Sequence, residues 1–167
     1  MKFHHVPSVI AAVAAVVIYA TSLYAADVKA GDLQISAAWV RATPKGASVG
    51  GGYLTIANAG AAADRLIGGA SDASARFEIH EMSMDGGVMR MRALPNGLEI
   101  KSGQKIELRP GGNHVMFVGL TRSLEPGQQV KVMLTFEKAG KVEVEFPVQP
   151  IGAQNMHGGK GQMQHGH

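Results

Sequence analysis

The feature that most constrains the fold is a pair of segments near the end of the chain in which apolar residues fill every second position. The apolar residues are Val130, Val132, Leu134 and Phe136 in the first segment and Val142, Val144 and Phe146 in the second. A turn sequence, Lys138-Ala139-Gly140, lies between them. Alternation with a period of two is the pattern of a β-strand with one buried face. The two segments therefore predict an antiparallel hairpin packed on a core.

The rest of the chain also predicts β-structure, because short apolar segments alternate with glycine, proline, asparagine and aspartate. The expected strands cover residues 33–41, 52–58, 65–69, 76–84, 88–94, 98–100, 105–108, 114–119, 129–137 and 141–148. No segment after residue 25 shows a clear helical period of 3.6 residues. Many short strands with regular turns indicate an all-β sandwich or barrel.

The first 25 residues resemble an export signal. Lys2 gives a positive start, an apolar stretch runs from Val9 to Ala20, and small residues follow at Ala25 and Ala26. This is the layout of a secretory signal peptide, and the stretch is short for a membrane span. We expect cleavage after Ala25, with cleavage after Ala26 or an uncleaved anchor as the alternatives. No twin arginine precedes the stretch, which favours the general secretion route and a periplasmic location.

Composition excludes several classes of function. The net charge is only +3 and the basic residues are scattered, so nucleic-acid binding is not expected. The chain has no cysteine, which excludes disulfides, zinc–thiolate sites and thiol nucleophiles. It has nine methionines and seven histidines. Thioether and imidazole ligands suit copper, the thioether particularly Cu(I), whereas Ca²⁺ and Mg²⁺ prefer clustered oxygen ligands.

The spacing of these ligands predicts a metal site on the sheet. If Asp85-Gly86 forms the two-residue turn of a hairpin, His80 faces Met91 on the neighbouring strand. His114 and Met116 are two residues apart on another strand and therefore project from one face. The four side chains His80, Met91, His114 and Met116 are the predicted Cu(I) ligands.

Other interpretations of these residues are open at this point. Methionine on a strand is more often core packing, and a single histidine is more often hydrogen-bonded than metal-bound. The pattern places Met82 and Met89 on the same face as the proposed pair, so it does not choose among these sulfurs. The possible contribution of Met82, Met84 or Met89 is left open. If the site transfers its ion to an acceptor, Met91 and Met116 are expected to be partly exposed, against the usual burial of methionine.

These residues resemble the periplasmic copper chaperones called PCu(A)C. The resemblance is carried by His80-Glu81-Met82, Met89-Arg90-Met91 and the Pro110-to-Met116 segment PGGNHVM. It extends over about residues 33–148. It implies a cupredoxin-like β-sandwich that binds Cu(I) through His80, Met91, His114 and Met116. It also implies copper delivery to the binuclear copper centre of cytochrome c oxidase subunit II, with a Sco-type thiol copper chaperone as a partner. A membrane would then be involved only through the acceptor.

The C-terminal residues 151–167 form a second candidate metal feature. They lack apolar periodicity and predict a disordered tail after the domain of residues 26–150. The potential ligands in this tail are Met156, His157, Met163, His165 and His167. Histidine-rich tails bind Cu(II) and other late divalent ions, and the alternative is a solvated tail with incidental histidines.

Competing functions have less support in the sequence. A copper electron-transfer protein would need a cysteine thiolate, which the chain lacks. A copper oxygenase that uses its N-terminal histidine would need a histidine where cleavage leaves Ala26 or Asp27. No Ser-His-Asp set, carboxylate pair or phosphate loop stands out, so the chain is not expected to be an enzyme. A structural β-sandwich without metal transfer, or a copper storage or tolerance protein, is the remaining alternative.

Overall fold

The computed structural model describes residues 26–155, and these residues form eleven β-strands. The strands are β1 (Val28–Ala30), β2 (Leu33–Arg41), β3 (Val49–Asn58), β4 (Asp64–Ser71), β5 (Ser74–Asp85), β6 (Val88–Ala93), β7 (Leu98–Ile100), β8 (Lys105–Leu108), β9 (His114–Leu120), β10 (Gln129–Phe136) and β11 (Gly140–Gln149). Within these 130 or so residues, no helix is long and apolar enough to cross a membrane. The predicted signal peptide, residues 1–25, lies outside the described residues.

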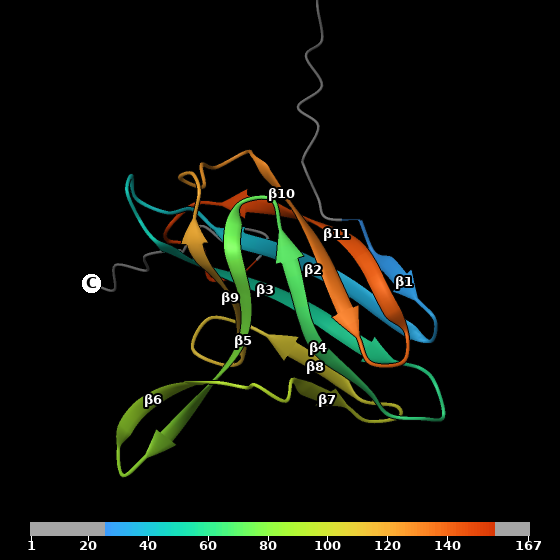
Figure 1. Cartoon of the computed structure of the whole chain (residues 1–167). Helices are drawn as coiled ribbons and strands as arrows, with labels where there is room; N and C mark the ends of the chain where they lie inside the picture. Colours follow the sequence, from blue (N-terminus) through green and yellow to red (C-terminus); the bar gives the residue numbers. More distant parts are fainter. Residues whose placement is uncertain (1–25, 156–167) are drawn as a thin grey trace, which may run out of the picture.

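Seven of the strands close into a barrel. They follow the order β2-β11-β10-β4-β5-β9-β3, and β3 pairs again with β2. The remaining four strands extend the sheet beside β2, β3, β4 and β5. Strand β11 runs parallel to β2, while β10 and β11 form a long antiparallel hairpin. Figure 1 shows β6 and the end of β5 projecting away from the barrel at the lower left.

The core confirms the alternation that predicted the last hairpin. Val130, Val132, Leu134, Val144 and Phe146 are all at most 1% exposed. The Phe146 ring lies 6.2 Å from the Phe117 ring in an edge-to-face arrangement, which is a favourable geometry for two aromatic side chains. The hairpin thus closes one side of the barrel by filling its interior.

The strand predictions agree closely with the structure, with one omission. The segments 33–41, 98–100 and 105–108 are strands with the predicted bounds. The other predicted strands are present with ends shifted by a few residues. Strand β1 was not predicted, because it depends on its pairing with β2. It pairs with β2 through a turn at Gly31, which has a positive φ of 57°.

Contacts with the barrel continue beyond the predicted domain boundary at Pro150. Ala153 is 5% exposed and packs with Trp39 and Tyr53. Arg41 donates a hydrogen bond from Nη2 to the carbonyl oxygen of Ala153, at 2.7 Å. A bulge in β2 with Ala37 at a positive φ of 49° precedes Trp39. The start of the predicted tail is therefore fixed against the outside of β2 and β3.

Candidate metal centre

The β5–β6 hairpin differs in register from the prediction. Asp85 pairs with Val88, so the two turn residues are Gly86 and Gly87, at φ values of 57° and 82°. Two-residue hairpin turns of this kind need positive φ at both positions, which two glycines adopt without steric cost. An Asp-Gly turn would have forced Asp85 into that conformation. The predicted facing of His80 and Met91 is wrong: His80 faces Ala93, and Met91 faces Met82.

The register error displaces the pairing by two residues, so the side chains keep their face of the sheet. His80 and Met91 lie on the same outer face and are diagonal neighbours rather than direct partners. Diagonal positions are about 7–8 Å apart, which is within reach of long side chains. The correction also brings Met82 closer to the site, because it faces Met91 directly and lies two positions after His80 on the same strand.

The central pair of the site is His80 and His114. These residues are direct partners across β5 and β9, and their ring centroids are 5.6 Å apart. The neighbouring positions Ile79 and Val115 point to the opposite face and are buried in the core. The two rings are thus held on the outer face by strands that the core fixes. The predicted four-ligand site requires the strand that begins at His114 to lie beside His80, and the structure places it there.

His80 has one nitrogen bound and one nitrogen free. Its Nε2 lies 2.9 Å from Oε2 of Glu78. Because a carboxylate only accepts hydrogen bonds, Nε2 carries the proton and donates it. The lone pair is then on Nδ1, which is buried and has no hydrogen-bond partner among the described residues. A buried acceptor without a partner costs free energy, and a metal ion bound at Nδ1 would remove that cost.

In His114, the hydrogen-bonded nitrogen and the nitrogen with the lone pair are exchanged relative to His80. Its Nδ1 lies 2.9 Å from the carbonyl oxygen of Gly112, which can only accept, so Nδ1 carries the proton. The lone pair of His114 is therefore on Nε2. Metal-binding histidines commonly donate their second ring nitrogen to a carboxylate or a backbone carbonyl. Since a metal-to-imidazole bond is about 2 Å long, the 5.6 Å between the ring centroids allows both rings to bind one ion.

Electrostatics keep the His114 imidazole available for a metal ion. Burial lowers the pKa of His114, opposed by its hydrogen bond to Gly112, and the nearby His80 lowers it further. His114 therefore remains neutral at a lower pH than an ordinary histidine. The hydrogen bond from His80 lowers the pKa of Glu78, with Arg76 contributing through an ion pair at 3.3 Å. Glu78 is thus ionised when it orients His80.

The predicted methionine ligands lie on the same face of the sheet as this pair. Met116 follows His114 by two positions, on the same face, and is half-buried. Met91 is 50% exposed. The prediction that both methionines are partly exposed is confirmed. The structure brings His80, His114, Met116 and Met91 onto one face of β5, β9 and β6, and the predicted tail ligands from Met156 to His167 lie outside the described residues.

Sequence reasoning missed the groups that orient the two histidines. Glu78 lies two positions before His80 on β5, so its placement on the same face follows from the strand period. That spacing was visible in the sequence. The role of the Gly112 carbonyl was not, since it depends on the path of the loop between β8 and β9.

Comparison with known sequences identifies the family of this chain. The model of the family described as "LpqE-like: Putative lipoprotein LpqE-like" matches residues 33–148. The chain belongs to the LpqE-like family. A similar protein is "Putative lipoprotein Lxx21020" of Leifsonia xyli subsp. xyli (strain CTCB07). It is 32% identical over 127 residues, which cover 76% of this chain and 75% of that protein.

Solved structures similar to this LpqE-like chain include PCuAC domains. The apo PCuAC domain from PmoF1 is 27% identical with a TM-score of 0.62, covering 75% of this chain and 99% of that one. The solution structure of CuI-DR1885 from Deinococcus radiodurans is 27% identical with a TM-score of 0.56, covering 67% and 74%. The copper-bound PCuAC domain from PmoF2 shares the fold at 24% identity, with a TM-score of 0.65 over 75% and 98%. These findings confirm the PCu(A)C resemblance and the all-β, cupredoxin-like fold.

Proposed function

We propose that this protein binds Cu(I) through His80 Nδ1, His114 Nε2 and the sulfurs of Met91 and Met116. The observation that carries the proposal is the pair of imidazoles with one nitrogen of each fixed by a hydrogen bond. The other nitrogen of His80 is buried without a partner. Two of the similar solved structures are described as copper-bound and as CuI-DR1885, which supports the choice of metal.

The ligand chemistry favours a site that binds Cu(I) and later releases it to an acceptor. All four donors are neutral, so they add no charge to the site, and thioethers bind without losing a proton. Met91 is half exposed, so an acceptor protein can reach the ion from that side. An acceptor with thiolate ligands would draw Cu(I) from neutral ligands. These properties suit a carrier and not an enzyme.

We further propose the binuclear copper centre of cytochrome c oxidase subunit II as the acceptor, with a Sco-type thiol chaperone as a partner. This part rests on the resemblance to PCu(A)C proteins. Transfer is tested by mixing the Cu(I)-loaded protein with the soluble copper domain of subunit II, separating the two and measuring copper in each. Copper that stays with this protein in the presence of the acceptor and a Sco-type partner would favour the alternative of a storage or tolerance protein.

We place the protein in the periplasm, exported by the general secretion route. The signal-like sequence of residues 1–25 supports export. The family and the curated relative are both named as lipoproteins, which fits an exported or envelope-associated protein.

We propose a separate role for the tail in binding Cu(II). Its potential ligands are Met156, His157, Met163, His165 and His167. A variant that ends at Asn155 keeps the contact between Arg41 and Ala153 and removes all five residues. This variant is expected to lose Cu(II) binding and to keep Cu(I) binding. Unchanged Cu(II) stoichiometry in the shortened chain would remove the tail from the proposal.

The main site is tested by anaerobic Cu(I) binding in competition with a chromophoric chelator. The mature protein is compared with the variant His80→Ala/Met91→Ala/His114→Ala/Met116→Ala. The wild type is expected to retain one tightly bound Cu(I) that the variant loses. Equal retention by both proteins would show that these residues are packing groups and would leave an exported β-barrel protein without a copper site on the sheet.

A further inference from the structure

Beyond the histidine pair, the β5–β6 hairpin has a face made of methionines. Met84 faces Met89 directly, and Met82 faces Met91 directly. These four positions share the outer face with His80, because side chains alternate along each strand. The methionines therefore form two cross-strand pairs, one beside the histidines and one at the tip next to Gly86 and Gly87.

The tip pair, Met84 and Met89, is too exposed for its side chains to be explained as core packing. Met84 is 67% exposed and Met89 is 55% exposed, although methionine is among the residues most often buried. Strand β9 pairs with β5 only as far as His80, so it does not cover the outer half of the hairpin. Figure 1 shows this half extending away from the barrel. The sulfurs of the tip pair thus do not fill the core.

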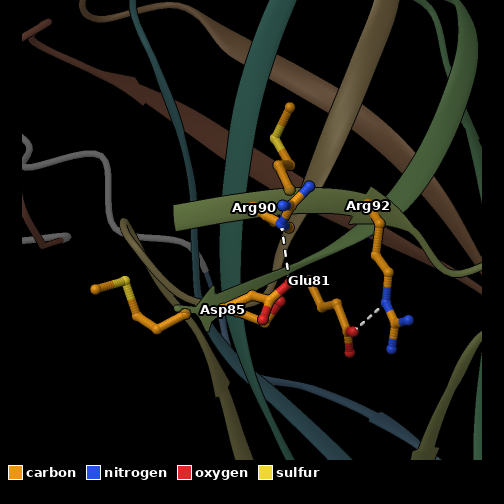
Figure 2. Close-up of a pocket in the computed structure, with 7 residues that line it drawn as sticks. Glu81, Asp85, Arg90 and Arg92 are labelled. Carbon is orange, nitrogen blue, oxygen red and sulfur yellow. Dashed lines mark hydrogen bonds and ion pairs between the residues drawn. The ribbon is translucent and has the colours of Figure 1, made fainter. Parts of the chain in front are cut away.

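The opposite face of the hairpin is charged and internally paired. Arg90 forms an ion pair with Asp85 at 3.1 Å, and Arg92 forms one with Glu81. Figure 2 shows these four side chains around an open hollow, to whose lining Met84 and Met91 also contribute. Glu81 and Asp85, the acidic residues of this face, therefore each have an arginine partner.

The chemistry of the methionine face selects one class of ligand. Thioethers are neutral and soft, so they bind Cu(I) and disfavour Ca²⁺, Mg²⁺ and Zn²⁺. Among residues 26–155, no cluster of three His, Cys, Asp or Glu side chains could hold a metal ion. The sulfurs of the methionine face are therefore the candidate ligands for a second metal site in this part of the chain.

We propose that Met84 and Met89 form a second Cu(I) site at the tip of the hairpin. Directly opposed residues have Cβ atoms about 4.5–5.5 Å apart, and the flexible methionine side chain lets both sulfurs reach one ion. Two thioethers leave coordination positions open for an incoming or departing ligand. Met82 and Met91 lie between this site and His80, so the tip is an exchange position for the site proposed above. This role in exchange rests on the proposed function, whereas binding at the tip does not.

The test is a Cu(I) titration of the full mature protein with methyl-¹³C methionine, followed by NMR under anaerobic conditions. The methyl signals of Met91 and Met116 are expected to shift in the first equivalent and those of Met84 and Met89 in the second. Met156 and Met163 give separate signals, so binding by the tail is recognised as such. If the Met84 and Met89 methyls do not respond while the tail methyls do, the tip does not bind Cu(I) and the proposal is wrong.

A variant series separates this inference from the main site. Met84→Leu/Met89→Leu keeps side-chain size and is expected to lower the number of bound Cu(I) ions by one, leaving the first equivalent unchanged. Met133→Leu on β10 is the matched control and is expected to bind as wild type. In His80→Ala/His114→Ala, the Met84 and Met89 signals are expected still to shift. In the wild type, absence of the Met91 and Met116 response alone would contradict the proposed function, and absence of the Met84 and Met89 response alone would contradict this inference.

Discussion

Two antiparallel hairpins of this protein have similar pairing and opposite surroundings. In β10–β11, the residues on one face are valine, leucine and phenylalanine, and they are almost entirely buried. In β5–β6, the outer face beyond His80 carries methionines that are 50–67% exposed at Met84, Met89 and Met91. The first hairpin closes the barrel, and the second projects from it (Figure 1).

The difference shows that alternation predicts the face of a residue but not its burial. Branched and aromatic side chains are stiff and fill a core with little loss of rotamer freedom. Methionine is flexible and polarisable, so it fits a face that must bind and release a soft ion. The residue types, rather than the period, separate the hairpin that stabilises the fold from the hairpin that carries the proposed chemistry.

The largest expected contrast comes from truncating one side chain in each hairpin. Phe146→Ala leaves a cavity beside Phe117 and is expected to lower the free energy of unfolding by about 3–5 kcal/mol. Met84→Ala removes a side chain that is 67% exposed and is expected to change the free energy of unfolding by less than about 0.5 kcal/mol. Urea unfolding of both variants measures the contrast. Similar losses would mean that the β5–β6 methionines contribute to packing.

The next largest effect is expected on Cu(I) affinity, when the groups that orient the histidines are changed. Glu78→Ala removes the acceptor of the His80 Nε2 proton and is expected to weaken Cu(I) affinity about 10–100-fold. Glu78→Gln retains an acceptor oxygen and is expected to recover part of this loss. The matched control is Glu81→Ala, which removes the carboxylate that directly follows His80 and lies on the opposite face of β5. Equal affinities of Glu78→Ala and Glu81→Ala would argue against orientation of His80 by Glu78.

A smaller effect on the free energy of unfolding is expected at the β10–β11 turn. Asp64 accepts backbone hydrogen bonds from Lys138 and Ala139, both at 2.9 Å, at the β10–β11 turn. Burial alone would raise the pKa of Asp64, but these bonds and one from the Arg65 N–H lower it overall. Asp64→Asn is therefore expected to cost about 1–2 kcal/mol at neutral pH.

The pH dependence of this cost has a defined sign. Because the folded-state pKa of Asp64 is lowered, its carboxylate contributes fully above the unfolded-state pKa, and the contribution is lost as pH falls through the folded-state pKa. Urea unfolding at pH 6 and at pH 3 is expected to show a smaller difference between wild type and Asp64→Asn at pH 3. A difference that grows on acidification would contradict the assignment.

The smallest expected effect is on the charged face of β5–β6. Glu81→Ala breaks the ion pair with Arg92, whose side chain is 73% exposed. Exposed ion pairs contribute little, so the free energy of unfolding is expected to change by less than about 0.5 kcal/mol. Thermal unfolding in low and high salt checks this result. A clear loss would mean that the charged pairs hold the projecting hairpin in place.

Most of the fold followed from the sequence because its strands are short, alternating and bounded by turn residues. The burial of Val132 and Leu134 needed only the two-residue period. Strand β1 escaped prediction because it depends on pairing with β2. The contact between Arg41 and Ala153 depends on tertiary structure and has no local signal.

The residues of the candidate site could be predicted from the sequence, but the strand register that pairs them could not. His80 and His114 were chosen by chemistry, and the strand period put Met116 with His114. The register of β5–β6 depended on whether Asp85 or Gly87 entered the turn, and the backbone preference of glycine decided it. The free nitrogen of each ring depends on Glu78 and on the Gly112 carbonyl, so only the three-dimensional structure identified it.

The most direct test of the central claim is ¹⁵N NMR of the histidine rings in the mature protein, before and after one equivalent of Cu(I). We predict that the His80 signal changes at Nδ1 and the His114 signal at Nε2, while the protonated nitrogens keep their hydrogen bonds. Unchanged ring signals for both residues, or copper bound at His80 Nε2 with loss of the bond to Glu78, would contradict the account.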